Sequence, residues 1–441
     1  MYTRRYLRDI LSTAFLSAWF CWGLSASPAQ RTAAPVPSLL SLEEAKRIAF
    51  QQNWDLLAAH SDIDIAHAQR LASREFPNPT LSIGTTKVNS DHNPQSTLAG
   101  NTLWHRNYDT VAAISQLLEI GGKRSHRQES ALAGIKAAES RFRDGRRVLE
   151  EAVATAYVTV LLSDENVKIL RQSAISLRRE ADIAQRRLGA GDISQAEKTQ
   201  IEIAAERLEL DANSAATNAT QSRIFVEVLL GAGQPGGAWA PTDDLGVLLA
   251  ESQLPDLHRI APGVRPDIEA ADALLEKATA DWRLQKSIRI PDPTFSLQYE
   301  HEPPDQPNTI GLTLSFPLPL WNRNRGGIQA ASASRDQAEG NAQRVRAAAA
   351  AQSAVARASY LDALQKWSRY RDQLQPKSAQ VRETVVFAYE KGGASLLDLL
   401  SAERNDNDIR LATAQAMADT AAKAATLKSV LNLSTQNLNS K

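Results

Sequence analysis

Few side chains in this 441-residue chain have the spacing of a metal site. His60 and His67 lie seven residues apart and would share one face of a helix, but two imidazoles without a third ligand do not make a metal site. Methionine occurs only at positions 1 and 417, so no row of thioethers exists that would suit Cu(I). We therefore expect no metal ligation and interpret both histidines as surface residues.

Enzyme signatures are also missing from the sequence. It contains no GxSxG, HExxH, P-loop or CxxC motif, and its carboxylates are interspersed with lysines and arginines, as on solvated coiled-coil faces. The 50 basic residues balance the 50 acidic ones, and no basic run with aromatic partners occurs. We expect no catalytic residue, no cofactor and no nucleic-acid partner.

The elements that position the remaining candidates occur twice. Four residues recur 201 residues later: Gly191 as Gly392, Ser194 as Ser395, Glu202 as Glu403 and Leu230 as Leu431. Upstream, residues 53–83 resemble residues 265–297. Copies of about 200 residues are too long for a solenoid repeat. The pattern indicates duplication of a whole supersecondary unit.

The N-terminus has the pattern of a secretory signal peptide. Three arginines precede an apolar run over residues 10–26, and small residues follow. We expect cleavage after Ala26 or Ala29; the alternative is an uncleaved anchor helix, for which the run is shorter than the ~20 residues of a span. Cys21 follows two aromatic residues where lipoprotein processing needs small ones, so we expect no lipidation.

Each copy predicts a helix followed by two strands. The first helix opens at Ser41, with Glu44 at capping-box spacing, and ends before Pro77; its counterpart runs from Pro266 to before Pro291. Alternation of apolar and polar residues then predicts strands with one apolar face. These strands cover 81–83, 109–118, 294–300 and 311–316, with polar linkers at 87–108 and 301–308.

Very long helices follow the strands. Residues 124–188 and 325–389 contain little that breaks a helix, apart from single glycines and Pro376, which should kink the second one. Sixty-five helical residues span about 100 Å. Glycine-containing turns at 189–194 and 391–395 end them, and return helices run to about Leu230 and Leu431.

These elements require an assembly if the strands enter a membrane. No later apolar stretch is long enough for a membrane helix; the best, residues 152–162, predicts one buried helical stretch. Four strands cannot close a barrel, because the smallest bacterial barrels have about eight, and open edges are not viable in lipid. A dimer would supply eight strands and a trimer 12. The long helices must then project into an aqueous space.

The order of these features resembles the TolC-like outer-membrane efflux proteins. Several stretches carry the likeness, together with the two glycine turns: residues 41–59, 77–83, 116–133 and 316–331. The resemblance covers residues 41–433. The junctions EIGGKR (119–124) and PLPLWNRNRG (317–326) are most similar to the heavy-metal branch, such as cobalt–zinc–cadmium efflux components.

The resemblance implies a mainly α fold with a β-barrel portion, in which three protomers form a 12-stranded barrel and a periplasmic helical tunnel. The homotrimer would lie in the outer membrane of a Gram-negative-type cell, in contact with its lipid. It would be a passive exit duct for heavy-metal cations, served by a periplasmic adaptor and an inner-membrane RND-type pump. Multidrug efflux or type I secretion are alternative roles, and a periplasmic coiled-coil scaffold without a channel is an alternative of another class.

The predicted organisation has five parts. They are a signal peptide (1–29), a first structural repeat (30–231), a connector (232–262), a second repeat (263–433) and a C-terminal tail (434–441).

The two turns hold the candidate docking residues. Glycine permits the positive φ that a tight turn needs, and serine caps the following helix. The resemblance adds docking of the adaptor to these residues: Gly191, Ser194, Gly392, Gly393 and Ser395. Good turn chemistry alone is the alternative.

The resemblance also implies a pore gate in the second turn. Tyr389 and Asp398 match family positions that help to close and to ring the pore. Ala394 stands where an arginine often helps lock the gate, and Ser401 where a second aspartate can lie. One aspartate repeated around a three-fold axis would still make a carboxylate ring that favours cations. A solvated helix carboxylate is the alternative.

Aromatic residues flank the predicted strands and form either interfacial girdles or ordinary packing: Trp104, Tyr108, Tyr299 and Trp321. Pro317 and Pro319 are expected to turn the strand into the helix. The alanine-rich run 346–360 predicts a seam of close helix packing.

Overall fold

The computed structural model describes residues 36–86, 109–252, 263–302 and 306–433. The predicted signal peptide, Cys21, the linker 87–108 with Trp104 and Tyr108, and the C-terminal tail lie outside these ranges. Residues 36–441 form one structural unit, and the description concerns that unit alone.

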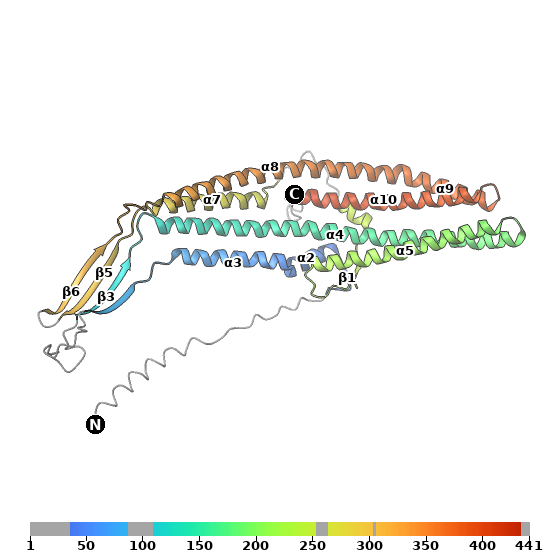
Figure 1. Cartoon of the computed structure of the whole chain (residues 1–441). Helices are drawn as coiled ribbons and strands as arrows, with labels where there is room; N and C mark the ends of the chain where they lie inside the picture. The colour runs from blue at the N-terminus through green and yellow to red at the C-terminus, as the bar shows by residue number, and fades with distance from the viewer. Residues whose placement is uncertain (1–35, 87–108, 253–262, 303–305, 434–441) are drawn as a thin grey trace, which may run out of the picture. The chain divides into compact units, whose positions relative to one another are not determined.

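In its described residues the first copy contains four helices, two of them in a long hairpin. They are α2 (Leu42–Gln52), α3 (Trp54–Arg74), α4 (Lys123–Ala190) and α5 (Gln195–Leu229). At 1.5 Å per residue, the 68 residues of α4 span about 100 Å, as expected. Figure 1 shows α5 returning along α4. In the described ranges no helix is both long and apolar enough to cross a bilayer.

The prediction of one continuous first helix was wrong. Ser41 caps it as expected, but the chain leaves helical geometry at Asn53, which ends α2 and begins α3. The Asn53 Oδ1 atom accepts a hydrogen bond from the backbone N–H of Leu56, and its Nδ2 donates to the carbonyl of Leu229, both at 3.0 Å. The amide thus caps one helix and ties it to another, which offsets the lost helical bonds.

The second copy repeats the hairpin. Its elements are α7 (Pro266–Ser287), α8 (Arg325–Arg369), the π-helical turn η2 (Tyr370–Leu374), α9 (Gln375–Glu390) and α10 (Leu396–Val430). The irregularity expected at Pro376 takes the form of η2, in which the N–H of Gln375 bonds to the carbonyl of Tyr370, five residues back. Pro376 has no N–H to continue the α-helical pattern, so the wider turn absorbs the mismatch just before it.

The strands of both copies form one antiparallel sheet. It contains β2 (Thr80–Thr86), β3 (Asp109–Leu117), β5 (Thr294–Glu302) and β6 (Gln306–Ser315), paired in the order β2-β3-β5-β6. The strands of the second copy are longer than predicted, because β5 and β6 extend into the expected linker 301–308. In the described residues, β2 and β6 each pair with a single strand, so each has one open edge.

Register places the apolar side chains of the sheet on one face. Leu81, Ile114, Leu297 and Leu312 are consecutive partners across the four strands and are 44–70% exposed. The next row is polar, and in it the hydroxyls of Ser115 and Ser296 are hydrogen-bonded at 2.8 Å. The predicted alternation is confirmed, and its apolar face is uncovered in the single chain.

The two motifs that carried the heavy-metal resemblance lie where strands lead into long helices. Lys123 is buried and pairs with Asp292 of the other copy, with 2.7 Å between Nζ and Oδ1. Asn324 stands at the N-cap position of α8 with φ of 53°, and its Nδ2 donates to the carbonyl of Gln285 at 2.8 Å. Both motifs therefore have a structural role in turning the chain from the sheet into the helices.

The connector between the copies contributes to the main core. It contains β4 (Ala240–Pro241), which pairs in parallel with β1 (Leu39–Leu40), and α6 (Leu245–Ser252). Trp239 stacks on Tyr157 of α4 with ring centroids 6.1 Å apart, and the Tyr157 hydroxyl donates to the carbonyl of Leu40 at 2.8 Å. Val153, Tyr157 and Val160 are fully buried, which confirms the buried stretch predicted at 152–162.

Candidate functional site at the helix turns

The two hairpin turns are built by the same rules. Gly191 ends α4 with φ of 84°, and Gly392 follows α9 with φ of 76°, a conformation that favours glycine. Ser194 and Ser395 begin the return helices with complete capping boxes. These four residues are explained by turn chemistry. Gly393 is different: its φ is not positive, and an added Cβ would make only an ordinary contact with the carbonyl of Ala388 at 3.5 Å.

Asp398 is the third residue of its capping box. Its Oδ2 accepts hydrogen bonds from the N–H of Ser395 at 3.1 Å and from the Ser395 hydroxyl at 2.7 Å, and these bonds lower the pKa of the carboxyl. Glu197 occupies the matching position in the first turn and bonds Ser194 in the same way. Helix capping therefore accounts for a carboxylate at 398, and the pore ring stays a prediction.

An apolar cluster joins the two turns. Its buried members come from α4, α5, α9 and α10: Ala184, Ile201, Tyr389, Leu396 and Leu399. Tyr389 is only 3% exposed. The structure thus brings Tyr389 into contact with both hairpins, whereas Asp398 lies exposed on the surface. The two gate candidates are not part of one contact.

Sequence analysis missed the residue that links the turns through Tyr389. Arg187 of α4 donates from Nη1 to the Tyr389 carbonyl at 3.1 Å, and its guanidinium carbon lies 5.0 Å from the centre of the Tyr389 ring. Ala394 occupies the position where related proteins often have an arginine that helps lock the gate. In this chain, Arg187 from the other hairpin contacts Tyr389 instead. The sequence shows only that Arg187 lies just before Gly191; nothing local indicates its partner.

The Tyr389 hydroxyl is unusual among buried polar groups. It makes no hydrogen bond of normal geometry in the described residues, and burial raises its pKa, while the nearby Arg187 acts in the opposite direction. An unpartnered buried hydroxyl costs free energy. The ring of Tyr389, rather than its hydroxyl, therefore holds the turns together.

Above the turns, polar side chains connect the two hairpins. Ser173 of α4 donates to Asn407 of α10 at 2.9 Å, and Arg410 of α10 donates to Gln172 of α4 at 2.6 Å. Further along the same pair of helices, the contact is apolar and includes Val153 of α4. The contact between α4 and α10 therefore changes from apolar packing near the connector to polar hydrogen bonds nearer the turns.

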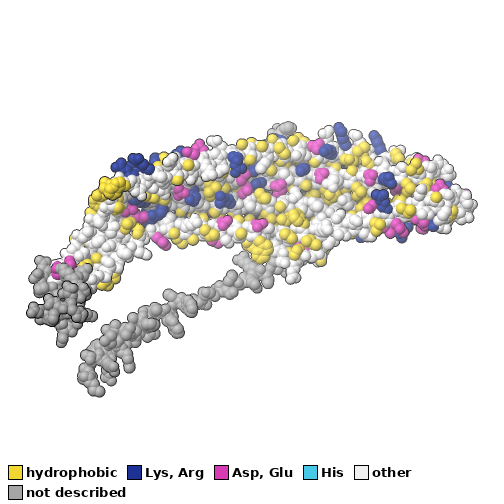
Figure 2. Space-filling view, in the orientation of Figure 1, with side chains coloured by type: hydrophobic (Ala, Val, Ile, Leu, Met, Phe, Trp, Pro, Cys, Tyr) yellow, Lys and Arg dark blue, Asp and Glu magenta, His cyan; other side chains and the backbone are white. Residues whose placement is uncertain are grey.

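A groove of about 390 Å³ lies beside this contact, between α5 and α10. Apolar and charged side chains line it, among them Ile203, Arg207, Leu208, Leu400, Arg404 and Asp408. Elsewhere on the helices, charges of both signs are scattered, as Figure 2 shows. That distribution is typical of solvated helical bundles.

The remaining sequence candidates are surface residues. His60 and His67 are exposed, and His60 lies 3.7 Å from Asp64. Across the described ranges, no three His, Cys, Asp or Glu side chains gather as a metal site. Trp321 is 93% exposed beside the sheet, while the Tyr299 hydroxyl donates to Asn308. Whether these aromatics form a girdle stays a prediction.

Comparison with known proteins decides the family. The outer membrane efflux protein family matches residues 47–232 and 260–433. The chain belongs to the outer membrane efflux protein family. One relative is the cobalt-zinc-cadmium resistance protein CzcC of Cupriavidus metallidurans. It is 27% identical, and the alignment covers 97% of this chain and 99% of the relative. Proteins of this family are efflux channels, not enzymes.

Solved structures share the fold. A membrane protein from Pseudomonas aeruginosa aligns with a TM-score of 0.73 and 20% identity, covering 88% of this chain and 93% of the other. CusC, described in a study of folding and transmembrane channel formation, aligns with a TM-score of 0.72 and 17% identity, covering 88% and 91%. The fold is therefore that of the TolC-like channels, and the family resemblance seen in the sequence is confirmed.

Proposed function

We propose that this chain is the outer-membrane exit duct of a tripartite efflux system for heavy-metal cations. Three copies form the duct, with the sheet in the outer membrane and the long helices in the periplasm. An inner-membrane RND-type pump supplies energy and selects the substrate, and a periplasmic adaptor joins pump and duct. The relationship to CzcC supports the class of substrate.

The observation that carries the proposal is the sheet. Its row of exposed apolar side chains, from Leu81 on β2 to Leu312 on β6, would be unfavourable in water and suits the hydrocarbon of a bilayer. The edges of β2 and β6 are open in the described chain. Pairing β6 of one copy with β2 of the next satisfies both edges, and three copies supply 12 strands.

The adaptor is assigned to the turn end of the hairpins. The groove between α5 and α10 has the mixed apolar and charged lining that an amphipathic helix recognises. Gly393 supports this assignment, because the turn geometry itself does not require glycine at that position.

The first test is membrane fractionation followed by native mass spectrometry of the detergent-extracted protein. A trimer from the outer membrane is expected. A soluble periplasmic monomer would contradict the channel and favour a coiled-coil scaffold. Loss of tolerance to cobalt, zinc and cadmium on deleting the gene would support the substrate class, whereas unchanged metal tolerance with lost drug tolerance or protein secretion would overturn it.

Neighbouring residues on β6 provide a matched pair of variants. Leu312 belongs to the apolar face and Thr313 to the polar face of the sheet. Leu312→Lys is expected to reduce outer-membrane assembly, since lysine on the lipid face of a barrel costs about 2–4 kcal/mol near the bilayer centre. Thr313→Lys should assemble normally. Equal assembly of both variants would show that the apolar face does not meet lipid.

A further inference from the structure

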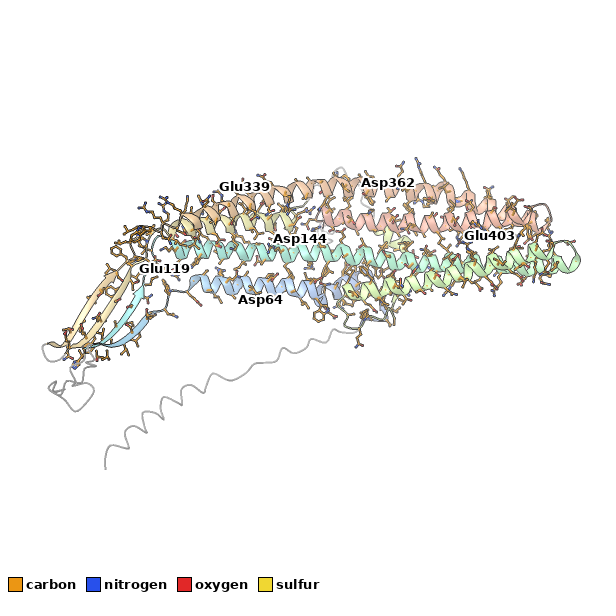
Figure 3. All side chains as sticks on the ribbon, viewed as in Figure 1. Asp64, Glu119, Asp144, Glu339, Asp362 and Glu403 are labelled. Carbon is orange, nitrogen blue, oxygen red and sulfur yellow. The ribbon has the colours of Figure 1, made fainter. Side chains whose placement is uncertain are left out.

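A buried carboxylate cluster lies between the two hairpins, away from the turns themselves. Glu180 comes from α4, Glu403 and Asp406 from α10, and Arg382 from α9. Glu180, Glu403 and Asp406 are 5–7% exposed. Figure 3 labels Glu403 on α10, beside the first hairpin. Burying several carboxylates together is costly unless each is compensated by a cation or a proton.

Arg382 compensates only part of the cluster. Its Nη1 donates to Glu403 Oε1 at 3.3 Å, and its Nε lies 3.4 Å from Asp406 Oδ2. Asp406 also accepts a hydrogen bond from the hydroxyl of Ser378 at 2.8 Å. Glu180 Oε2 is buried with no hydrogen-bond partner in the described residues. Arg382 therefore contacts two carboxylates of its own hairpin, whereas an oxygen of Glu180, from the other hairpin, is buried without a hydrogen bond.

The duplication shows that the fold does not require this cluster. Asp406 occupies the position that Ala205 has in the first copy, and both are buried. Glu403 matches Glu202, which instead is 45% exposed and pairs with Lys198 at 2.9 Å. The first copy thus packs the equivalent site without buried charge. The second copy therefore carries a desolvation free energy that the first copy does not.

We propose that the buried cluster of Glu180, Glu403 and Asp406 takes up a proton and acts as a pH-dependent latch between the two hairpins. With the proton bound, one of the carboxyls is neutral and α4 packs tightly on α10. Without it, three buried carboxylates have a single arginine among them, which weakens this packing.

The surrounding charges support proton binding. Burial raises the pKa of both Glu180 and Glu403; the nearby charges of Glu390 and Glu403 raise the first further, and that of Asp406 raises the second. Arg382 acts in the opposite direction on both. The other charged groups near Glu403 are Arg410, which is bonded to Gln172, and the groove residues Arg404 and Asp408 of α10 with Arg207 and Asp211 of α5.

The sign of the effect follows from linkage. A carboxyl whose folded pKa lies above its unfolded value of 4.5 binds more protons in the folded protein, so packing is strongest in mild acid and weakens as the pH rises above 4.5 through the folded pKa. In the channel proposed above, opening of the turns would then be easier at higher pH. This consequence rests on the proposed function, whereas the packing itself does not.

Hydrogen exchange of the full-length mature protein in detergent tests the latch. Amides of α10 around Glu403, corrected for intrinsic chemical exchange, are followed from about pH 5 to about pH 8. One linked proton changes the opening equilibrium by up to about tenfold per pH unit, so protection is expected to fall by up to that factor as the pH rises. A flat wild-type profile would overturn the proposal without any variant.

Two variants localise the effect. Glu180→Gln keeps position 180 neutral at every pH, so its protection should match the wild type in acid and fall less as the pH rises. Glu202→Gln removes the exposed carboxylate that matches Glu403 and should leave the wild-type profile unchanged. An undiminished pH dependence in Glu180→Gln, or a diminished one in Glu202→Gln, would refute the latch. Because exchange measures packing rather than transport, failure of the channel function would not affect the result.

Discussion

Arg187 and Tyr389 join the two copies of the duplicated unit at their turns, although they lie 202 residues apart in the chain. The guanidinium of Arg187 donates to the Tyr389 carbonyl, at the last turn of α9, and lies over the ring of the same residue. A cation near the C-terminus of a helix is favourable, because free carbonyls there carry partial negative charge. The Arg187 side chain therefore hydrogen-bonds to the last turn of α9 in the other hairpin and covers the ring of the buried Tyr389.

Arg187→Ala is predicted to loosen the contact between the turns. Loss of a charged hydrogen bond and a cation–π contact at a half-exposed site should cost about 1 kcal/mol. Faster hydrogen exchange at the end of α9, and larger single-channel conductance if the turns close a pore, are the readouts. Arg186→Ala is the matched control, since Arg186 is exposed and makes no ion pair in the described structure. Identical exchange rates and conductance in the two variants would show that Arg187 does not hold the turns together.

Two substitutions at Tyr389 distinguish the role of its ring from that of its hydroxyl. Tyr389→Phe should retain the contact between the turns and stabilise it by up to about 1 kcal/mol, because it removes a buried hydroxyl without a partner. Tyr389→Ala should cost about 3 kcal/mol through the cavity it leaves. Thermal unfolding and conductance measure both effects. A leaky Tyr389→Phe channel would mean that the hydroxyl has a partner in the assembled protein.

Comparing substitutions at Asp398 and Glu197 distinguishes a role in gating from a role in helix capping. Both complete a capping box, so Asp398→Ala and Glu197→Ala should fray the starts of α10 and α5 to a similar extent. Only Asp398→Ala is expected to raise leak and reduce cation preference if Asp398 rings the pore. Planar-bilayer conductance with ion-selectivity measurements distinguishes them. Equal conductance changes in both variants would assign Asp398 to capping alone.

The same two carboxylates make a pH prediction. Their pKa values are lowered by bonds to Ser194 and Ser395, so each cap is fully present above the unfolded pKa, 4.5 for Glu197 and 3.8 for Asp398, and is lost as the pH falls through the lower folded value. Exchange at the starts of α5 and α10 should therefore increase in strong acid. This direction is opposite to that of the Glu180–Glu403 cluster.

Two glycines with similar backbone angles should respond differently to alanine. A Cβ at Gly231 would lie 2.3 Å from the carbonyl oxygen of Gln52, whereas one at Gly191 would have nothing within 4 Å. Gly191→Ala should cost about 1 kcal/mol from its positive φ alone. Gly231→Ala adds a backbone clash and should cost clearly more, with a lower yield of folded protein. Equal melting temperatures would contradict the close approach at Gly231.

Predictions that depended on neighbouring residues agreed with the structure. The Gly191 and Gly392 turns, the Ser194 and Ser395 caps and the alternation in the strands all involve residues within about four positions of each other, where local rules apply. The break at Asn53 had a local signal too, since asparagine is a favoured N-cap, but the helical pattern on both sides obscured it.

The sequence by itself determined the duplication, the order of the strands and long hairpins, the turn chemistry and the family. Tertiary structure alone decided that Arg187 reaches Tyr389 and that Glu403 is buried while its equivalent Glu202 faces solvent. The two glutamates have the same type and the same place in the repeat, so no local pattern distinguishes them. Their environments differ because packing between helices far apart in the chain sets burial and dielectric, and these set the chemistry of each carboxylate.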